Sequence, residues 1–239
     1  MKDKGSQKPR KVDIGISRRT FLKRAGGVVV LIGVAGCDPG ERLESLVMLE
    51  DGKSGIPVSE GYLLVDTKKC QGCMSCMLAC SLVHEGEENL SLARIQIIQN
   101  PFGKFPDDLT LEQCRQCVDP ACVEACPEEA LTVDVEHGNV RRIDAEKCIG
   151  CMQCVEACPY DPSRAVWNFQ EDRAQKCDLC ADTPHWNRKG GPAGLQACVE
   201  ICPLGAITFT TKIPVQEGDE GYHVNLRGEG WENLGYSRR

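Results

Sequence analysis

The chain has 239 residues, 17 cysteines and a formal net charge of −7. Its 5% aromatic content and 24 glycines provide little material for an ordinary hydrophobic core, so we expect the interior to need cross-links of another kind. Residues 1–36 hold nine Lys or Arg and two Asp, so the rest of the chain carries a net charge of −14. This acidic balance argues against nucleic acid as a partner and favours a basic docking face on a partner protein.

The N-terminus carries a basic segment followed by a short apolar run. Residues 17–23 read Ser-Arg-Arg-Thr-Phe-Leu-Lys, and the apolar run spans residues 26–36. With Arg18 and Arg19 side by side, this segment resembles the twin-arginine export signal. The run is too short to cross a bilayer core of ~30 Å as a helix. We therefore expect export of the folded protein; the alternative is a chance basic segment before a buried helix.

Cys37 is the one cysteine outside four repeated groups. It follows Val-Ala-Gly at residues 34–36, which resembles a lipobox, whose cysteine becomes the lipidated first residue of the mature chain. A lipid would anchor the protein to a membrane without spanning it. The alternative is an ordinary small-residue cleavage site with an incidental cysteine. Residues 1–37 are thus the expected signal, and residues 38–60, with Pro, Gly, Ser and charges, a linker.

Regular structure is expected to begin after this linker. Residues 62–66 are strand-like, residues 93–99 alternate as a strand should, and a short helix is expected between them through His84. Residues 85–92 read as a polar loop, and residues 101–106 as a turn region.

Sixteen cysteines fall into four groups of four. Residues 148–159 read C-x2-C-x2-C-x3-C-P, the run that holds a cubane iron–sulfur cluster. Three thiolates can surround one cluster only if the loop between them is tight, which Gly150 permits, and the fourth, Cys158, leaves on a helix toward a second cluster. The groups are Cys70, Cys73, Cys76 and Cys80; Cys114, Cys117, Cys122 and Cys126; Cys148, Cys151, Cys154 and Cys158; Cys177, Cys180, Cys198 and Cys202.

Disulfides and structural zinc are the competing interpretations. Exported proteins often contain disulfides, but C-x2-C pairs repeated four times are poor disulfide staples. A tetrahedral zinc site needs only two such pairs and no C-x3-C-P ending. We therefore predict four [4Fe–4S] clusters with these sixteen cysteines as the iron ligands.

An internal repeat accompanies the cysteines. The last three groups end in Cys-Pro and lead into apolar stretches at residues 130–133, 165–169 and 206–209. Strand, cysteine loop, helix, Cys-Pro and strand make up the unit of a bacterial two-cluster ferredoxin. We predict an α+β, loop-rich fold of two pseudo-symmetric two-cluster ferredoxin units over residues 61–211. Residues 212–239 read as a polar C-terminal tail that lies on the surface or on a partner.

Few other residues suggest chemistry. Lys69, Lys147 and Lys176 each precede the first cysteine of a group, where they either raise a cluster potential or form surface salt bridges. The loop 181–197 with Trp186 is either a docking lid or a surface cover. Trp167 is expected in the core. Histidines without metal-ligand spacing, expected to be solvated or hydrogen-bonded, are His84, His137, His185 and His223.

Residues 60–210 resemble the four-cluster electron-transfer subunits of the dimethyl sulfoxide, polysulfide and tetrathionate reductase family. The resemblance implies that groups one and four pair around groups two and three, and that each pair exchanges its last cysteine. The implied ligand sets are Cys70, Cys73, Cys76 and Cys202; Cys177, Cys180, Cys198 and Cys80; Cys114, Cys117, Cys122 and Cys158; Cys148, Cys151, Cys154 and Cys126.

The same resemblance implies a function in anaerobic respiration. The chain would relay single electrons, on the periplasmic side of the cytoplasmic membrane, between a quinone-linked membrane subunit and a catalytic molybdopterin- or tungstopterin-type subunit. No nucleophile–base pair, phosphate loop or open metal site emerges from the sequence, so we predict no catalytic site of its own. The alternative is a free or lipid-anchored periplasmic ferredoxin shuttle without a permanent partner.

Overall fold

The computed structural model describes residues 55–105 and 107–234. The export motif at Arg18 and Arg19, the candidate lipidation site Cys37 and most of the expected linker lie outside the described residues. The strands are β1 (Tyr62–Val65), β2 (Ile95–Gln99), β3 (Leu109–Gln113), β4 (Leu131–Asp134), β5 (Val140–Ile143), β6 (Ala165–Asn168), β7 (Arg173–Lys176) and β8 (Ile207–Thr210). The helices are α2 (Ser75–Glu85), α3 (Ala121–Glu124), α4 (Gln153–Glu156), α5 (Ala197–Ile201), α6 (Glu229–Asn233) and the 3₁₀ turns η1 (Leu90–Leu92) and η2 (Val135–His137).

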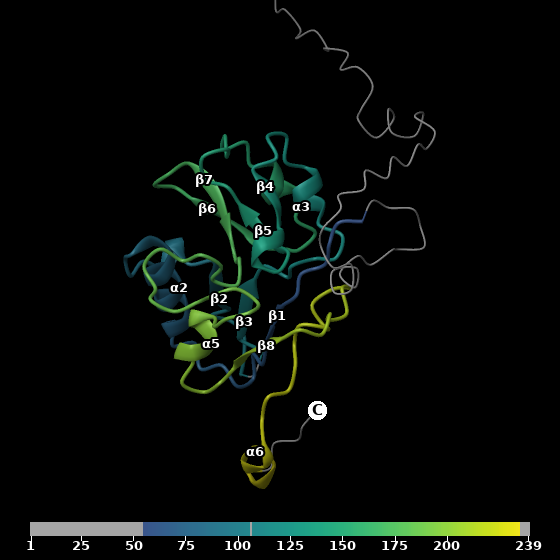
Figure 1. Cartoon of the computed structure of the whole chain (residues 1–239). Coiled ribbons are helices and arrows are strands. Elements are labelled where there is room, and N and C mark those ends of the chain that lie inside the picture. The colour runs from purple at the N-terminus through teal and green to yellow at the C-terminus, as the bar shows by residue number, and fades with distance from the viewer. Residues whose placement is uncertain (1–54, 106, 235–239) are drawn as a thin grey trace, which may run out of the picture. The chain divides into compact units, whose positions relative to one another are not determined.

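These elements form a mixed α/β, loop-rich structure (Figure 1). The strands pair in four antiparallel two-stranded sheets, of which β2–β3, β4–β5 and β6–β7 join consecutive strands. The fourth sheet joins the first strand to the last, with Tyr62 opposite Thr210 and Val65 opposite Ile207. In Figure 1, β4 to β7 and α3 occupy one half, whereas β1 to β3, β8, α2 and α5 occupy the other.

The helix and strands expected around the cysteine groups are present. The helix α2 ends at Gly86, and β4, β6 and β8 follow the three Cys-Pro pairs. Sequence reasoning missed β3 and β7, whose buried positions include the polar residues Gln113, Gln175 and Lys176. Their polarity conceals the pattern from which buried strands are normally recognised. It also missed η1, which lies within the expected polar loop.

Two cysteine loops share one backbone conformation. Met74 and Met152, which precede α2 and α4, have φ of 60° and 61°, and Gly72 and Gly150 have φ of 70° and 69°. Left-handed residues allow a tight loop, and glycine adopts this conformation without strain. At Gly150 a Cβ would lie 2.5 Å from the carbonyl oxygen of Asp172, so a larger residue does not fit.

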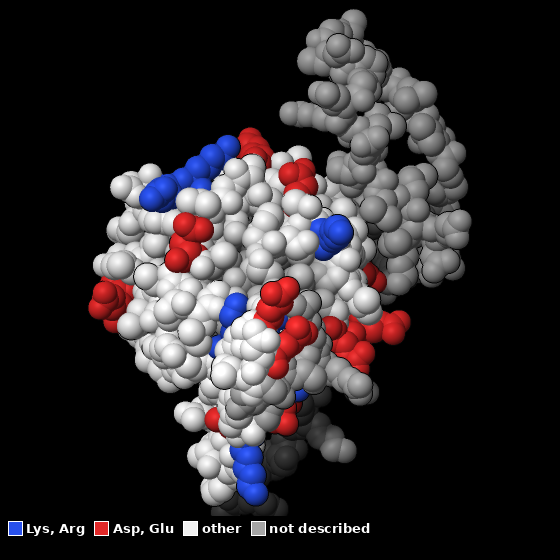
Figure 2. Space-filling model, turned by 90° about the horizontal axis from the view of Figure 1, so that it is seen from below, with Lys and Arg blue, Asp and Glu red and all other residues white. Residues whose placement is uncertain are grey.

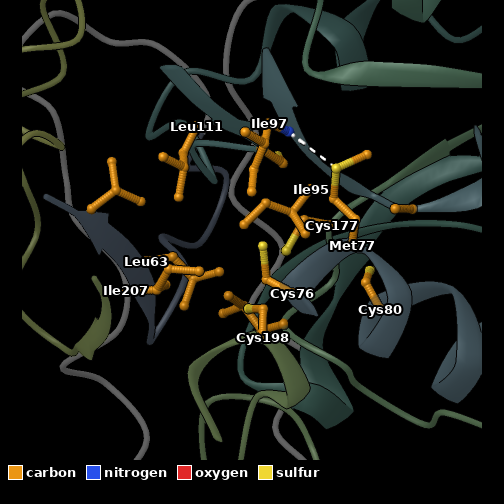
Figure 3. Packing of buried hydrophobic residues seen from close by; sticks show 14 of the residues in the cluster. Leu63, Cys76, Met77, Cys80, Ile95, Ile97, Leu111, Cys177, Cys198 and Ile207 are labelled. Atoms are coloured by element: carbon orange, nitrogen blue, oxygen red, sulfur yellow. Dashed lines mark hydrogen bonds between the residues drawn. The ribbon is translucent and has the colours of Figure 1, made fainter. Parts of the chain in front are cut away.

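The main core mixes hydrocarbon side chains with thiols (Figure 3). Leu63, Ile95 and Leu111 are buried there, and the backbone N–H of Ile97 donates to the sulfur of Met77 at 3.3 Å. The cysteines in the same cluster of buried residues are Cys76, Cys80, Cys114, Cys177 and Cys198. Thiols therefore hold interior positions that aliphatic side chains usually fill.

The expected C-terminal tail packs in part on its own domain. Tyr222 is fully buried, its carbonyl accepts from Val65 N–H at 2.9 Å, and Val65 accepts in turn from Val224 N–H at 2.8 Å. At the other end, the carbonyl of Pro57 accepts from the Arg141 guanidinium at 2.9 Å, so packing begins before residue 61. Pro57 and Tyr222 lie outside helices and strands, so no periodic pattern in the sequence predicts these contacts. Within the described ranges, no helix has the length and apolar character needed to cross a membrane.

Candidate metal centres

The structure brings twelve of the sixteen cysteines together in three sets of four, each of which lines a void. The remaining four, Cys80, Cys177, Cys180 and Cys198, are buried, and none of the sixteen forms a disulfide. The three sets that line voids are combinations that the family resemblance implies, and iron ligation by these cysteines stays a prediction. We name the four sets quartet A (Cys70, Cys73, Cys76, Cys202), quartet B (Cys80, Cys177, Cys180, Cys198), quartet C (Cys114, Cys117, Cys122, Cys158) and quartet D (Cys126, Cys148, Cys151, Cys154).

Strand pairing closes quartets A and D. Cys70 follows β1 and Cys202 precedes β8, so the β1–β8 sheet brings the last group back to the first. In the same way, Cys126 precedes β4 and Cys148 follows β5, and the β4–β5 sheet joins them. Each of these quartets thus takes three cysteines from one group and one from another.

Helix packing closes quartets B and C. The helix α2, which carries Cys80, packs against α5, which carries Cys198. Likewise α3, which carries Cys122, packs against α4, and Cys158 follows α4 directly. Each of these four helices carries at least one cysteine, and most have only one or two turns. Their main contribution is therefore to position thiols.

The last cysteine of every group accepts a backbone hydrogen bond at its sulfur. Such N–H···S bonds stabilise a thiolate and tune iron–sulfur potentials. The sequence gives no sign of them, because the donors share no residue type. They run from Arg94 N to Cys80 Sγ at 3.3 Å, from Leu131 N to Cys126 Sγ at 3.4 Å, from Arg164 N to Cys158 Sγ at 3.2 Å and from Ala206 N to Cys202 Sγ at 3.2 Å.

The voids of quartets A and D have mostly apolar walls. Ile97, Leu111 and Ile207 line the void of quartet A, and Leu131 and half-buried Trp167 line that of quartet D. Including the space open to solvent, their volumes are about 320 and 370 Å³, and that of quartet C is about 370 Å³. Each of the three voids is lined by the four cysteines of one quartet.

The void of quartet C is lined by four buried cations. The Lys176 ammonium lies 3.5 Å from Cys122 Sγ, and the Arg141 guanidinium donates to the Cys117 carbonyl at 2.8 Å. Burial disfavours the charge of Lys176, but Cys114 and Cys122 raise the pKa of the ammonium above its usual value. The four cations, with their exposed fractions, are Arg115 (1%), Arg141 (0%), Arg164 (3%) and Lys176 (4%).

The three lysines that precede cysteine groups therefore differ in role. Lys176 contacts a thiol, whereas Lys147 forms an exposed ion pair with Asp144 at 3.4 Å and Lys69 donates to the carbonyl of Leu226 at 3.0 Å. Sequence reasoning singled out all three alike. It missed the three arginines: Arg115 lies inside the C-x2-C pair of the second cysteine group, and Arg141 and Arg164 lie in segments without a motif.

Histidine and aspartate lie beside quartet B. The ring of His84 contacts the Cys80 carbonyl at 2.8 Å through Nδ1 and the Asp178 carboxylate at 3.0 Å through Nε2. Burial alone would lower the pKa of His84, but Asp178 raises it to about 9. Arg94 also pairs with Asp178, at 2.5 Å. His84 is thus hydrogen-bonded, as expected, and His137 contacts Asp134 at 2.8 Å.

The donor set fits iron–sulfur clusters. Burial raises the pKa of Cys117 to about 12 and that of Cys154 to about 11, so an unliganded thiol at these positions is protonated at neutral pH. Iron ligation replaces the proton and leaves a thiolate. Within the described part of the chain, Lys176 and Arg141 have no carboxylate partner, and a buried cation is costly without an anion. A thiolate-ligated cluster in quartet C would supply that negative charge.

Comparison with known proteins agrees with this donor set. A family model described as a 4Fe-4S dicluster domain matches residues 107–212, and one described as a 4Fe-4S binding domain matches residues 67–83. YsaA of Escherichia coli strain K12, named as an electron transport protein, is 33% identical over 61% of this chain and 87% of its own length. The NrfC homolog of Haemophilus influenzae is 32% identical over 81% of this chain and 79% of its own. The chain belongs to the 4Fe–4S ferredoxin-type electron-transport family.

Other relatives are named for an enzyme operon or as an enzyme subunit. The hydrogenase-2 operon protein HybA of Escherichia coli O157:H7 is 32% identical over 82% of this chain, and this chain spans 63% of its length. The iron-sulfur subunit of the nitrate-inducible formate dehydrogenase of Escherichia coli strain K12 is 30% identical over 72% of this chain, which spans 61% of that subunit. The narrower resemblance to dimethyl sulfoxide reductase subunits stays a prediction.

Proposed function

We propose that the chain is the electron-transfer subunit of an exported multi-subunit oxidoreductase. It would relay single electrons between a quinone-linked membrane subunit and a catalytic molybdopterin- or tungstopterin-type subunit. A [4Fe–4S] cluster, when bound, accepts and donates one electron. The sixteen cysteines would hold four such clusters, one in each quartet. The observation that carries the proposal is the convergence of these cysteines in four adjoining quartets.

The quartets follow one another through the domain. One cluster of buried residues contains Cys76 of quartet A, Cys177 and Cys198 of quartet B and Cys114 of quartet C. Cys154 of quartet D also lines the void of quartet C. The order A, B, C, D supports a continuous electron path. The grouping of A with B around α2 and α5, and of C with D around α3 and α4, supports the predicted tandem ferredoxin units.

The two ends of this order reach the surface. Of the sixteen described cysteines, the exposed ones are Cys73 in quartet A and Cys151 in quartet D. Exposed apolar side chains accompany each end: Leu204 lines the void of quartet A, and Ile149, 64% exposed, lines that of quartet D. Apolar surface beside a redox centre is expected where a partner protein covers it. The exposed surfaces at quartets A and D thus provide one docking site for each of two partner subunits.

The surface charge is consistent with protein partners. Figure 2 shows a face on which acidic and basic side chains are interspersed. The proposal includes export by the twin-arginine route, placement on the periplasmic side of the membrane and a lipid on Cys37. It includes no catalytic site on this chain.

Iron quantification with low-temperature EPR on anaerobically purified protein tests the cluster count. We expect about 16 irons per chain and interacting signals of reduced [4Fe–4S] clusters after dithionite treatment. A count near zero, with zinc bound or disulfides formed, would overturn the proposal.

Co-purification in mild detergent separates a subunit from a shuttle. A subunit retains a stoichiometric partner, and Ile149→Glu should release the partner at the quartet D end. Leu82→Glu is the matched control, because Leu82 is also exposed but does not line a void of quartets A, C or D. Recovery of the iron-loaded chain alone would favour the free or lipid-anchored shuttle instead.

A further inference from the structure

The surroundings of the four quartets differ in charge. The walls of the quartet A void contain no charged residue among the described ones, and those of quartet D contain only Glu128. The walls of the quartet C void contain the four cations named above. Four quartets with the same ligand atoms therefore lie in different electrostatic environments.

The cations near quartet B are balanced by carboxylates. Arg94 pairs with Asp178 at 2.5 Å and with Glu85 at 3.3 Å, and His84 pairs with the same Asp178 at 3.0 Å. An ion pair of this kind presents little net charge to its surroundings. Quartet B thus has charged neighbours but little excess positive charge.

Only part of the positive charge at quartet C is balanced. Arg115 pairs with Asp219 at 2.6 Å, and Arg164 pairs with Glu112. In contrast, Arg141 donates to the carbonyls of Pro57, Asn139 and Cys117, and Lys176 approaches Cys122 Sγ. Neither of these two cations forms an ion pair within residues 55–105 and 107–234. The positive charges of Arg141 and Lys176 therefore act on the thiols of quartet C without a carboxylate to offset them.

Backbone hydrogen bonds to sulfur do not set quartet C apart from quartet A. The last cysteine of each group accepts one N–H···S bond, and the four distances lie between 3.2 and 3.4 Å. Two further bonds run from Gly72 N to Cys70 Sγ in quartet A and from Gln116 N to Cys114 Sγ in quartet C, both at 3.4 Å, so these two quartets receive a similar contribution to the potential. Charge is the feature in which quartet C differs from the others.

We propose that Lys176 and Arg141 raise the reduction potential of the cluster in quartet C above the potentials in quartets A, B and D. Reduction adds one electron, and a buried cation stabilises the added negative charge more than the same cation would in water. The interior quartet C is then where an electron rests between the two ends. This inference depends on the proposed function, because it requires a cluster in quartet C.

A redox titration of the iron-loaded protein, followed by EPR, tests the inference. Lys176→Met removes the charge and keeps the aliphatic stem. We expect the midpoint of the highest-potential signal to fall, with a smaller fall for quartet D, because Cys154 of quartet D and Lys176 both line the void of quartet C. Lys147→Met is the matched control, since Lys147 also precedes a cysteine group but forms an exposed ion pair, and we expect no change. Lys176→Arg should retain the high potential.

A second variant covers the case in which Lys176→Met fails to load quartet C. Arg141→Gln removes the other unpaired charge and should lower the same signal. An unchanged midpoint in the loaded variants, or a fall equal to that in Lys147→Met, would overturn the inference. Absence of clusters from the unmodified protein would instead overturn the proposed function, so the two failures are distinguishable.

Discussion

Quartets C and D have the same ligands but different surroundings. They share the α3–α4 helix pair, and each takes three cysteines from one group and one from the other. Quartet C is enclosed by four buried cations, whereas quartet D has apolar walls and the exposed thiol of Cys151. A cysteine motif therefore predicts that a cluster binds, and the residues around the cysteines specify the environment in which it works.

The largest expected effect is the difference in stability between a variant that lacks one ligand of quartet C and a variant that lacks one ligand of quartet D. Cys122→Ala should destabilise the protein more than Cys151→Ala, by about 3 kcal/mol, because loss of cluster C leaves buried cations without an anion. Anaerobic thermal unfolding of the iron-loaded variants measures the difference. Iron analysis provides the control, since each variant should fall from about 16 to about 12 irons. Equal destabilisation would show that the cations at quartet C do not depend on the cluster.

Substitution of Asp219 should change the reduction potential of cluster C by a smaller amount than Lys176→Met does, and in the opposite direction. Burial alone would raise the pKa of Asp219, but Arg115 and Arg164 lower it below the usual value, so the carboxylate is ionised at neutral pH. Asp219→Asn leaves the charge of Arg115 unbalanced and should raise the potential of cluster C. The shift should be smaller than that in Lys176→Met, because the Asp219 side chain is 40% exposed and solvent screens it. EPR-monitored titration checks the direction, and a fall would contradict it.

The smallest effect is expected at an ion pair of Arg142, which follows Arg141 in β5 but is 33% exposed, whereas Arg141 is fully buried. Asp134 pairs with Arg142 at 3.1 Å and with His137 at 2.8 Å. Burial alone would raise the pKa of Asp134, but hydrogen bonds from Arg142 and His137 lower it. Asp134→Asn should cost up to about 1 kcal/mol at pH 7. Because the pKa of Asp134 is lower in the folded protein than its unfolded value of about 3.9, ionised Asp134 stabilises the fold at pH values above about 4. The stability difference between the unmodified protein and Asp134→Asn should therefore shrink as the pH falls below about 4.

Thermal midpoints of the unmodified protein and Asp134→Asn, measured from pH 7 downward, check this sign. Redox titration of the same variant supplies the contrast, because no cluster potential should change. A shifted potential would mean that surface charge reaches the quartets as strongly as buried charge does.

Local features were predictable from the sequence. Spacing alone sorts the sixteen cysteines into four groups, and twelve of these cysteines line three voids in the structure. Gly150 was expected in the tight loop, where its φ of 69° and the nearby Asp172 carbonyl exclude larger residues. The stretches after each Cys-Pro form β4, β6 and β8. Each of these features depends on residues only a few positions apart. The covalent chain restricts how such residues can be arranged.

The electrostatic environment was decided only by tertiary structure. Arg115, Arg141 and Arg164 come from three segments without a shared motif, and long-range packing brings them to quartet C. Lys176 and Lys147 hold the same place before a cysteine group, yet one is buried against a thiol and the other pairs at the surface. The sequence by itself predicts the ligands, because cysteines at the C-x2-C-x2-C-x3-C-P spacing are typical of iron–sulfur cluster binding. Tertiary structure determined which quartet is surrounded by positive charge, because burial and charge pairing arise from contacts between distant segments.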